Sequence, residues 1–157
     1  VLALSLALRL GLAAFMPFTA DEAYAVVVSR SHALYYYDHP PLMFALARFM
    51  ADIGGSENPL WLRLPFVLMG TASAAFVYDI TRRCFNARAG FWASAAFSFS
   101  PFFLTFGQLL IVPDGPLDLF LLVSFWAMLP ILLEDQTNII NWLLLKYPSH
   151  YGTTIQV

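Results

Sequence analysis

The sequence predicts an all-α integral membrane protein with about four membrane helices. Hydrophobic residues occupy 60% of the 157 positions and charged residues only 11%, whereas a soluble domain carries about 25% charged residues. The apolar residues gather in runs of helical length, separated by short stretches that contain proline, glycine or charge. A chain of this composition cannot cover itself with a polar surface, so we expect lipid to surround it.

Charge and cysteine content exclude two further classes. The formal net charge is −2 and no basic patch is visible, so nucleic acid is excluded as a partner. Cys84 is the single cysteine, which excludes an internal disulfide framework and an all-cysteine metal site. We interpret it as a small apolar side chain on a membrane helix.

The first membrane helix is expected over Val1–Met16, and Pro17 ends it. Arg9 lies inside this helix. Because a guanidinium facing lipid is costly, Arg9 is expected either to snorkel or to face the bundle interior and a carboxylate; a structural pairing and a direct role in the site both stay open. The chain starts without methionine and is apolar from its first residue, so we expect it to be a fragment of a longer protein.

The polar and aromatic stretch Thr19–Leu42 is where we expect the chemistry. Thr19 and Glu22 have the spacing of a capping box, in which the hydroxyl and the carboxylate each bond a backbone N–H at the helix start. Asp21 then places a favourable charge at the positive end of the helix dipole. A second interpretation is compatible with the first, since a capped helix start would hold Asp21 and Glu22 rigidly, as a catalytic site requires.

Two short helices are expected to lie at the membrane interface. The first covers Glu22 to about Ser31, and the second covers Leu42–Ile53, where Gly54-Gly55 stops it. Both are too short to span the hydrocarbon core. The consecutive tyrosines Tyr35–Tyr37 between them are typical of an interfacial aromatic belt.

The next helix is expected to begin at Asn58-Pro59, to end near Ile80 and to span the membrane. The connector Thr81–Arg88 that follows carries three arginines and no acid. The positive-inside rule therefore predicts that this connector is cytoplasmic and that the Thr19–Asn58 region lies outside.

Two further membrane helices complete the predicted bundle. They cover Ala89 to about Leu110 and Leu117–Leu133, and the turn Ile111–Pro116 joins them on the outside. After Glu134-Asp135 the apolar pattern weakens. We therefore divide the chain into a membrane unit, residues 1–135, and an unassigned tail, residues 136–157, that could hold a truncated further helix.

This topology places the candidate site residues on one side of the membrane. They are charged or polar aromatic side chains from separate stretches of the chain: Asp21, Glu22, Tyr36, Asp38, His39, Arg63 and Asp114. The carboxylates with His39, and Asp21 and Asp114 above all, could bind a divalent metal. Carboxylate clusters also often pair with nearby arginines instead, so no metal is firmly indicated.

Four short motifs resemble those of one enzyme family in their spacing and order. They are Asp21-Glu22-Ala23-Tyr24, Tyr36-Tyr37-Asp38-His39-Pro40-Pro41-Leu42, Arg63-Leu64-Pro65 and Pro113-Asp114-Gly115-Pro116-Leu117. Together they resemble the amino-terminal part of a GT-C glycosyltransferase. The branch is that of the dolichyl-phosphate-mannose–protein mannosyltransferases and their bacterial relatives, which include the enzyme that adds aminoarabinose to lipid A.

The resemblance implies a GT-C-type transmembrane helix bundle with interfacial helices in its first outer loop. It also implies transfer of a sugar from a polyprenyl-phosphate carrier to a protein or lipid acceptor, by a single inverting displacement. The reaction would take place on the extracytoplasmic side, which in a bacterial inner membrane is the periplasmic side. No cofactor is implied beyond the lipid-linked donor, and the divalent metal stays open.

The resemblance also implies roles for individual residues. Asp21 matches the acid that acts as base or orients the acceptor, and Glu22 matches its partner, so these two are the catalytic candidates. The substrate-binding candidates are Asp38, His39, Arg63, Asp114 and Tyr36. Of these, the basic His39 and Arg63 would stabilise charge on the leaving phosphate, because a guanidinium pairs well with phosphate oxygens.

The family pattern covers about Val1 to Asp135 and fades after that. Family members are much longer, with further helices and often a soluble outer domain, so we expect this chain to be inactive alone. A non-catalytic transporter or lipid-carrier-handling protein stays open as an alternative, because short broken helices and intramembrane charges also line transport paths. The absence of inverted repeats and the concentration of charge outside the membrane favour the enzyme.

Overall fold

The computed structural model of the chain describes residues 1–31 and 39–133. All regular structure in these residues is helical, which confirms the all-α prediction. The elements, in chain order, are α1 (Leu2–Phe15), α2 (Ala20–Ser29), α3 (Pro41–Gly54), α4 (Pro59–Cys84), α5 (Ala87–Phe99), the π-helical turn η1 (Phe103–Gly107) and α6 (Asp114–Leu133).

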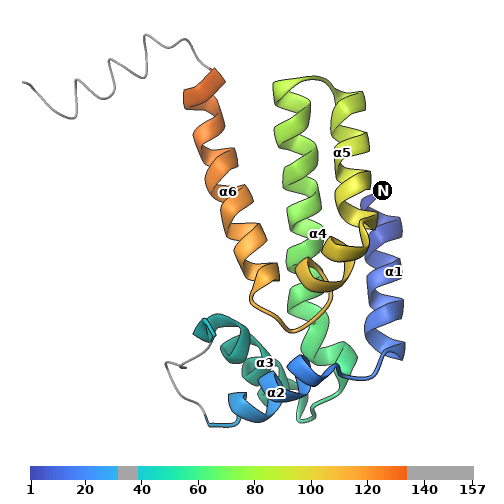
Figure 1. Cartoon of the computed structure of the whole chain (residues 1–157), viewed down its shortest axis with the longest axis vertical. Coiled ribbons are helices and arrows are strands. Elements are labelled where there is room, and N and C mark those ends of the chain that lie inside the picture. Colours follow the sequence, from blue (N-terminus) through green and yellow to red (C-terminus); the bar gives the residue numbers. More distant parts are fainter. Residues whose placement is uncertain (32–38, 134–157) are drawn as a thin grey trace, which may run out of the picture.

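Helices α1, α4, α5 and α6 stand upright, and α2 and α3 lie across one end of them (Figure 1). α4 is the central helix, because it packs against α1, α3, α5 and α6. The chain bends by 78° between α1 and α2, so α2 turns away from the bundle and packs on α3. The two short helices that the sequence predicts are therefore a pair at one end of the bundle.

Two helices in the described part of the chain are long and apolar enough to cross a membrane, α4 with 26 residues and α6 with 20. A third crossing exists only if the bent pair of α1 and α2 counts as one broken span. The segments predicted as membrane helices all stand upright, as α1, α4, α5 with η1, and α6 (Figure 1), but only α4 and α6 meet the length of a span as single helices. α1 is described over 14 residues and α5 over 13, fewer than the roughly 20 that a single continuous helix needs to span a core of about 30 Å.

The predicted span Ala89–Leu110 is not one helix. α5 ends at Phe99, Ser100 is extended, and Pro101 follows. A proline forces the residue before it out of the helical region and has no N–H to donate to the preceding turn. The apolar pattern continues through this break, so only the proline marks it. After η1, residues 108–113 form an irregular and mostly buried segment.

The opposite end of α4 also differs from the prediction. We expected the helix to end near Ile80, but it continues to Cys84, so the connector to α5 is much shorter than the predicted one. The carboxylate of Asp79 accepts hydrogen bonds from Arg82 and Arg83, one turn further on. Such pairs stabilise a helix, and arginines are favourable near its negative end.

Two arginines are fully buried in the bundle, Arg9 and Arg63. Arg9 faces the interior, in line with one of our two expectations. Its partners are not a carboxylate, however, but the hydroxyl of Thr71 and the amide oxygen of Gln108. The carboxylate expectation was wrong because the nearest acceptors on the facing segments are neutral.

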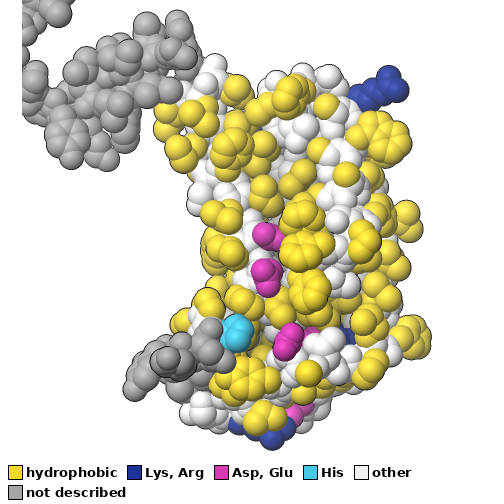
Figure 2. All heavy atoms as spheres, viewed as in Figure 1, with side chains coloured by type: hydrophobic (Ala, Val, Ile, Leu, Met, Phe, Trp, Pro, Cys, Tyr) yellow, Lys and Arg dark blue, Asp and Glu magenta, His cyan; other side chains and the backbone are white. Residues whose placement is uncertain are grey.

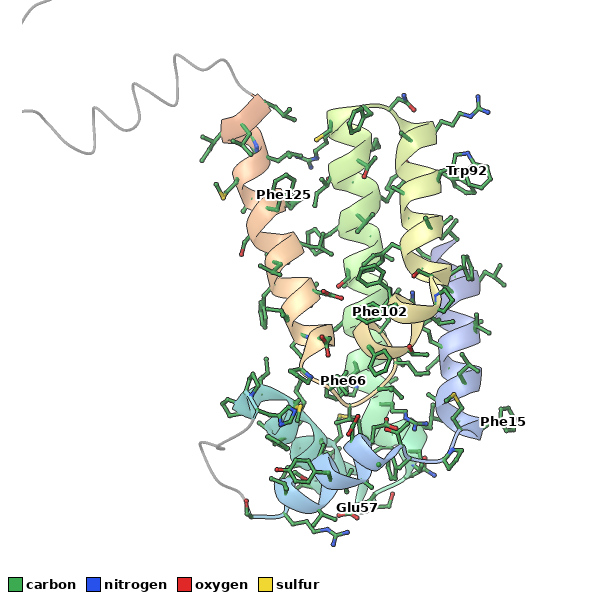
Figure 3. All side chains as sticks on the ribbon, in the orientation of Figure 1. Phe15, Glu57, Phe66, Trp92, Phe102 and Phe125 are labelled. Atoms are coloured by element: carbon green, nitrogen blue, oxygen red, sulfur yellow. The ribbon has the colours of Figure 1, made fainter. Side chains whose placement is uncertain are left out.

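The outer surface of the helices is largely hydrophobic (Figure 2). Phe15 and Trp92 point away from the helices that carry them (Figure 3) and are 90% and 63% exposed. Many other large apolar side chains are exposed on α1, α4, α5 and α6, which is unfavourable in water. The fold is therefore that of an integral membrane protein.

Candidate active site

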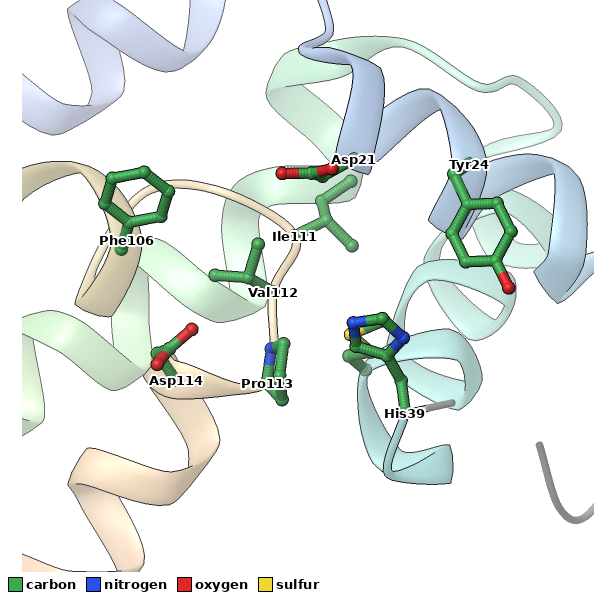
Figure 4. Close-up of a pocket in the computed structure, with 9 residues that line it drawn as sticks. Asp21, Tyr24, His39, Phe106, Ile111, Val112, Pro113 and Asp114 are labelled. Carbon is green, nitrogen blue, oxygen red and sulfur yellow. The ribbon is translucent and has the colours of Figure 1, made fainter. Parts of the chain in front are cut away.

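A pocket of about 240 Å³ lies where α2 and the start of α3 meet the segment that leads into α6. We call it the acidic pocket. Its lining consists of acidic, aromatic and apolar side chains: Asp21, Tyr24, His39, Met43, Phe106, Ile111, Val112, Pro113 and Asp114. Three predicted site residues, Asp21, His39 and Asp114, thus come together from three separate parts of the chain (Figure 4).

Asp21 and Glu22 are neighbours in the chain but lie in opposite environments. The Thr19 hydroxyl accepts the Glu22 N–H at 3.3 Å, and the Glu22 carboxylate accepts the Thr19 N–H at 2.9 Å, which confirms the predicted capping box. Successive residues of a helix point about 100° apart. Asp21 is accordingly exposed and lines the acidic pocket, whereas Glu22 is fully buried.

Glu22 forms a fully buried, bidentate ion pair with Arg63 of α4. Arg63 Nε donates to Glu22 Oε1 and Arg63 Nη2 donates to Glu22 Oε2, both at 2.7 Å. The other guanidinium hydrogens reach three backbone carbonyls at the end of α1, those of Ala13, Met16 and Pro17, at distances of 2.7–3.1 Å. All five donors of the guanidinium are thus used, as a buried charge requires.

Glu22 also holds the segment that precedes α6. Its Oε1 accepts the backbone N–H of Ile111 at 3.3 Å, and Ile111 lines the acidic pocket. Burial by itself would raise the pKa of the Glu22 carboxyl, but the hydrogen bonds and charge of Arg63, with the Thr19 and Ile111 N–H groups, keep that pKa below its ordinary value. One ionised side chain therefore ties α2 to α4 and to the pocket lining.

The Glu22–Arg63 pair itself does not line the acidic pocket. The sequence resemblance implied a catalytic role for Glu22 and a substrate-binding role for Arg63. The structure places both side chains in the interior with no exposed surface. The two residues meet across 41 positions of sequence, a contact that no local pattern could have indicated.

His39 lies just before the two prolines that open α3. Its ring packs against those of Tyr24 and Phe44, with ring centroids 6.3 Å away in both cases. These contacts fix the imidazole at one side of the acidic pocket, and Asp114 lies at the other (Figure 4). The pocket thus carries one cationisable group and two carboxylates.

Asp114 begins α6, which starts earlier than the predicted Leu117. Its carboxylate is in the first turn, where the helix dipole favours a negative charge. Asp118, one turn further, packs against the end of η1, since a Cβ at Gly107 would lie 2.6 Å from Asp118 Oδ2. The first turn of α6 is therefore packed directly against η1.

Two predicted site residues, Tyr36 and Asp38, lie outside the described residues. Sequence reasoning did not identify Phe106 and Val112 as pocket residues, because both follow the hidden helix break; Pro101 was the only available signal. Within residues 1–31 and 39–133, no group of three or more His, Cys, Asp or Glu side chains is arranged to hold a metal ion.

An apolar groove of about 220 Å³ adjoins the acidic pocket. It runs between the start of α3 and the first turns of α6, and its lining is almost entirely hydrophobic: Pro40, Leu42, Met43, Pro113, Pro116, Leu117 and Phe120. Met43 and Pro113 line both the groove and the acidic pocket. A polar compartment and an apolar one thus share a wall at this end of the bundle.

One protein-family model matches the chain. Its description is dolichyl-phosphate-mannose-protein mannosyltransferase, and the match covers residues 38–148, which is well over half of the chain. The matched stretch includes His39, Arg63 and Asp114 and begins after Asp21 and Glu22. No curated protein and no solved structure matches the chain.

Proposed function

The chain belongs to the dolichyl-phosphate-mannose-protein mannosyltransferase family, and we propose that it transfers a glycosyl group from a polyprenyl-phosphate-linked sugar to a protein or lipid acceptor. The family is one of membrane glycosyltransferases, and it implies a lipid-linked donor. The acceptor, the mechanism, the residues and the side of the membrane are our proposal.

The observation that carries the proposal is the shared wall between the acidic pocket and the apolar groove. A lipid-linked sugar has a polar head and an apolar chain, and the two compartments match these two parts. We place the sugar and its phosphate in the acidic pocket, with the phosphate beside His39, and the first part of the prenyl chain in the groove against Leu117 and Phe120.

The reaction we propose is a single displacement at the anomeric carbon. The carboxylate of Asp21 takes the proton of the acceptor hydroxyl as its oxygen attacks this carbon. The bond from the anomeric carbon to the phosphate oxygen breaks, the configuration inverts, and polyprenyl phosphate leaves with the bonding electrons. His39 donates a hydrogen bond that stabilises the charge building on that phosphate. Asp114 binds sugar hydroxyls from the opposite side of the pocket.

We assign Glu22 and Arg63 a positioning role in this mechanism. Arg63 has no guanidinium donor left for a phosphate, because Glu22 and backbone carbonyls accept from all of them. The pair instead fixes the start of α2, which carries Asp21, against Ile111 of the pocket lining.

We further propose that the acidic pocket faces the outside of the membrane, which is the periplasmic side of a bacterial inner membrane. Arg82, Arg83 and Arg88 lie around the end of α4 that is farthest from the pocket, and the positive-inside rule favours a cytoplasmic location for them. Cysteine labelling tests this orientation in a Cys84→Ser background. A cysteine at Ser56 should react in intact cells, and reaction only after permeabilisation would overturn the orientation.

The catalytic proposal is tested with the full-length protein in membranes and a labelled polyprenyl-phosphate sugar. Asp21→Asn keeps the shape of the side chain but removes the proton acceptor, so turnover should fall about 10²-fold or more at equal expression. The matched control is Asp52→Asn, which changes an exposed acid that pairs with Arg48 on α3 and should leave turnover unchanged.

Near-normal turnover of Asp21→Asn would overturn the assignment of Asp21 as the base. The transporter alternative predicts a different result altogether. In that case wild-type protein would move the lipid-linked sugar across vesicles without transferring the glycosyl group to any acceptor, and the proposed function would fail.

A further inference from the structure

We propose that Gln108, held by Arg9, is a positioning residue for the transfer reaction. Gln108 is fully buried and does not line the acidic pocket. It stands at the start of the segment that supplies Ile111, Val112 and Pro113 to the pocket lining and that leads into Asp114. The inference rests on the proposed function, and it adds two residues that neither the motifs nor the pocket identifies.

The side chain of Gln108 compensates for the helix break at Pro101. In a continuous α-helix the carbonyl of Phe97 would accept the N–H of residue 101, but a proline has none. The Nε2 of Gln108 donates to this carbonyl at 3.2 Å instead. An otherwise unpaired carbonyl inside the membrane is costly, so this bond anchors the irregular segment to the end of α5.

Arg9 fixes the other end of the Gln108 amide. Its Nη2 donates to Gln108 Oε1, and its Nη1 donates to the Thr71 hydroxyl at 3.1 Å. Among the described residues Arg9 forms no ion pair. A buried guanidinium without a carboxylate depends on neutral acceptors, so Arg9 holds the Gln108 oxygen firmly.

The backbone around Gln108 is packed closely against two helices. A Cβ at Gly70 of α4 would lie 2.4 Å from the Cβ and 2.7 Å from the Cα of Gln108, so only glycine fits there. On the other side, a Cβ at Gly115 of α6 would lie 3.2 Å from the carbonyl oxygen of Gly107. The start of the segment is thus confined between α4 and α6.

The pocket-lining segment is therefore held by side chains at two points. Gln108 holds its beginning through Phe97 and Arg9, and Glu22 holds its middle through the N–H of Ile111. If the hydrogen bonds of Gln108 are removed, the segment is held only at Ile111 and can rotate about that residue. Asp114 would then shift relative to Asp21, and a displacement of about 1 Å in a reacting site can cost about 10²-fold in rate.

The test compares variants of the full-length protein in membranes. Gln108→Met keeps the length and burial of the side chain but removes both hydrogen bonds, so kcat per folded molecule should fall about 10- to 100-fold while the donor KM stays near normal. Gln108→Glu keeps an oxygen for Arg9 but loses the N–H that bonds the Phe97 carbonyl, so it should recover only the part of the lost kcat that depends on Arg9. The control Ser94→Ala removes another buried hydrogen bond, from Ser94 to the carbonyl of Ala74, and should leave kcat unchanged.

Hydrogen exchange of the same variants gives a second measurement that does not depend on activity. In Gln108→Met the amides of residues 109–112 should exchange faster, while those of α3 and α4 keep their wild-type rates. General destabilisation would speed exchange throughout the bundle and would overturn the positioning role. Normal kcat in Gln108→Met, or an equal loss of kcat in Ser94→Ala, would also overturn it.

The two proposals fail in different ways. If wild-type protein transfers sugar and Asp21→Asn does not, but Gln108→Met is normal, only the positioning role of Gln108 is wrong. If wild-type protein transfers no sugar to any acceptor, the proposed function is wrong, and the positioning role falls with it.

Discussion

Two arginine–glutamate pairs in the described part of the chain are bidentate, with nearly the same geometry but opposite environments. In the Glu22–Arg63 pair both N···O distances are 2.7 Å and neither side chain is exposed. In the Arg30–Glu57 pair the distances are 2.9 and 2.6 Å, and the side chains are 54% and 32% exposed. Since the geometry is shared, burial decides what each pair does.

The difference in burial between the two pairs determines which of them shapes the site. Water solvates either partner of the exposed pair well, so the pair contributes little to stability. Loss of one partner of the buried pair would leave an uncompensated charge in the interior. The buried pair also connects α2, α4 and Ile111, whereas the exposed pair connects only the end of α2 to the loop before α4.

Arg9 is a third case that lies between these two. It is buried like Arg63, but its acceptors are the neutral groups of Thr71 and Gln108, and its Nε has no hydrogen-bond partner in the described part of the chain. Its charge is therefore less completely compensated than that of Arg63. Arg9 therefore depends on Gln108 as one of its two hydrogen-bond acceptors.

The largest expected effect is that of Arg63→Met. It leaves the Glu22 carboxylate buried without its counter-ion, so the free energy of unfolding should fall by about 3–5 kcal/mol. Thermal unfolding of the full-length protein in detergent measures this. The matched control is Arg30→Met, which removes the arginine of the exposed pair and should change Tm little.

The double variant Glu22→Gln/Arg63→Met sharpens this result. It removes the orphaned charge together with its partner and should recover part of the lost stability. One other outcome would support the substrate-binding role that the sequence resemblance implied for Arg63. If Arg63→Met folds normally and raises only the donor KM, then Arg63 contacts the carrier phosphate, and its pairing with Glu22 is secondary.

Glu22→Gln should have an intermediate effect. The amide oxygen can still accept from Arg63 or Ile111, and the guanidinium keeps its three backbone carbonyls, so we expect a loss of about 1–3 kcal/mol. kcat should also fall, since the hold on Ile111 weakens. An unchanged Tm would show that the buried pair stabilises the protein through its hydrogen bonds and not through the charge of Glu22.

The same variant has a distinct pH dependence. The pKa of Glu22 is lowered in the folded protein, so its ionisation contributes stability above the unfolded value of 4.5, and this contribution is lost as the pH falls through the folded pKa. Tm curves of wild type and Glu22→Gln should therefore differ at neutral pH and approach each other in acid. Parallel curves would contradict a buried, ionised Glu22.

Sequence reasoning succeeded where the signal is local. The capping box of Thr19 and Glu22 depends on residues three apart, and the structure confirms it. The existence of two short helices, α2 and α3, follows from the lengths between breaks. The prediction of a spanning helix from Pro59 onward follows from its length and apolar content, and α4 meets both criteria.

It failed where the deciding contact lies far away in the chain. The Glu22–Arg63 pair spans 41 positions and the Arg9–Gln108 pair 99, and a single sequence contains no trace of either contact. The break after α5 was missed for another reason. The run from Ala89 to Leu110 is apolar throughout, and Pro101 alone could have indicated that the helix stops.

The smallest expected effect is that of Glu57→Gln, and it tests the comparison from the exposed side. Hydrogen bonds from Arg30 lower the pKa of Glu57, so any contribution to stability exists at neutral pH and is lost as the pH falls through that lowered pKa. Because both side chains are largely solvated, we expect wild type and Glu57→Gln to have the same Tm within error at every pH and salt concentration. A loss of Tm as large as that of Glu22→Gln would mean that bidentate geometry stabilises the protein whatever its exposure. The shape of the pocket would then depend on the number of such pairs at this end of the bundle, and not on the burial of the Glu22–Arg63 pair.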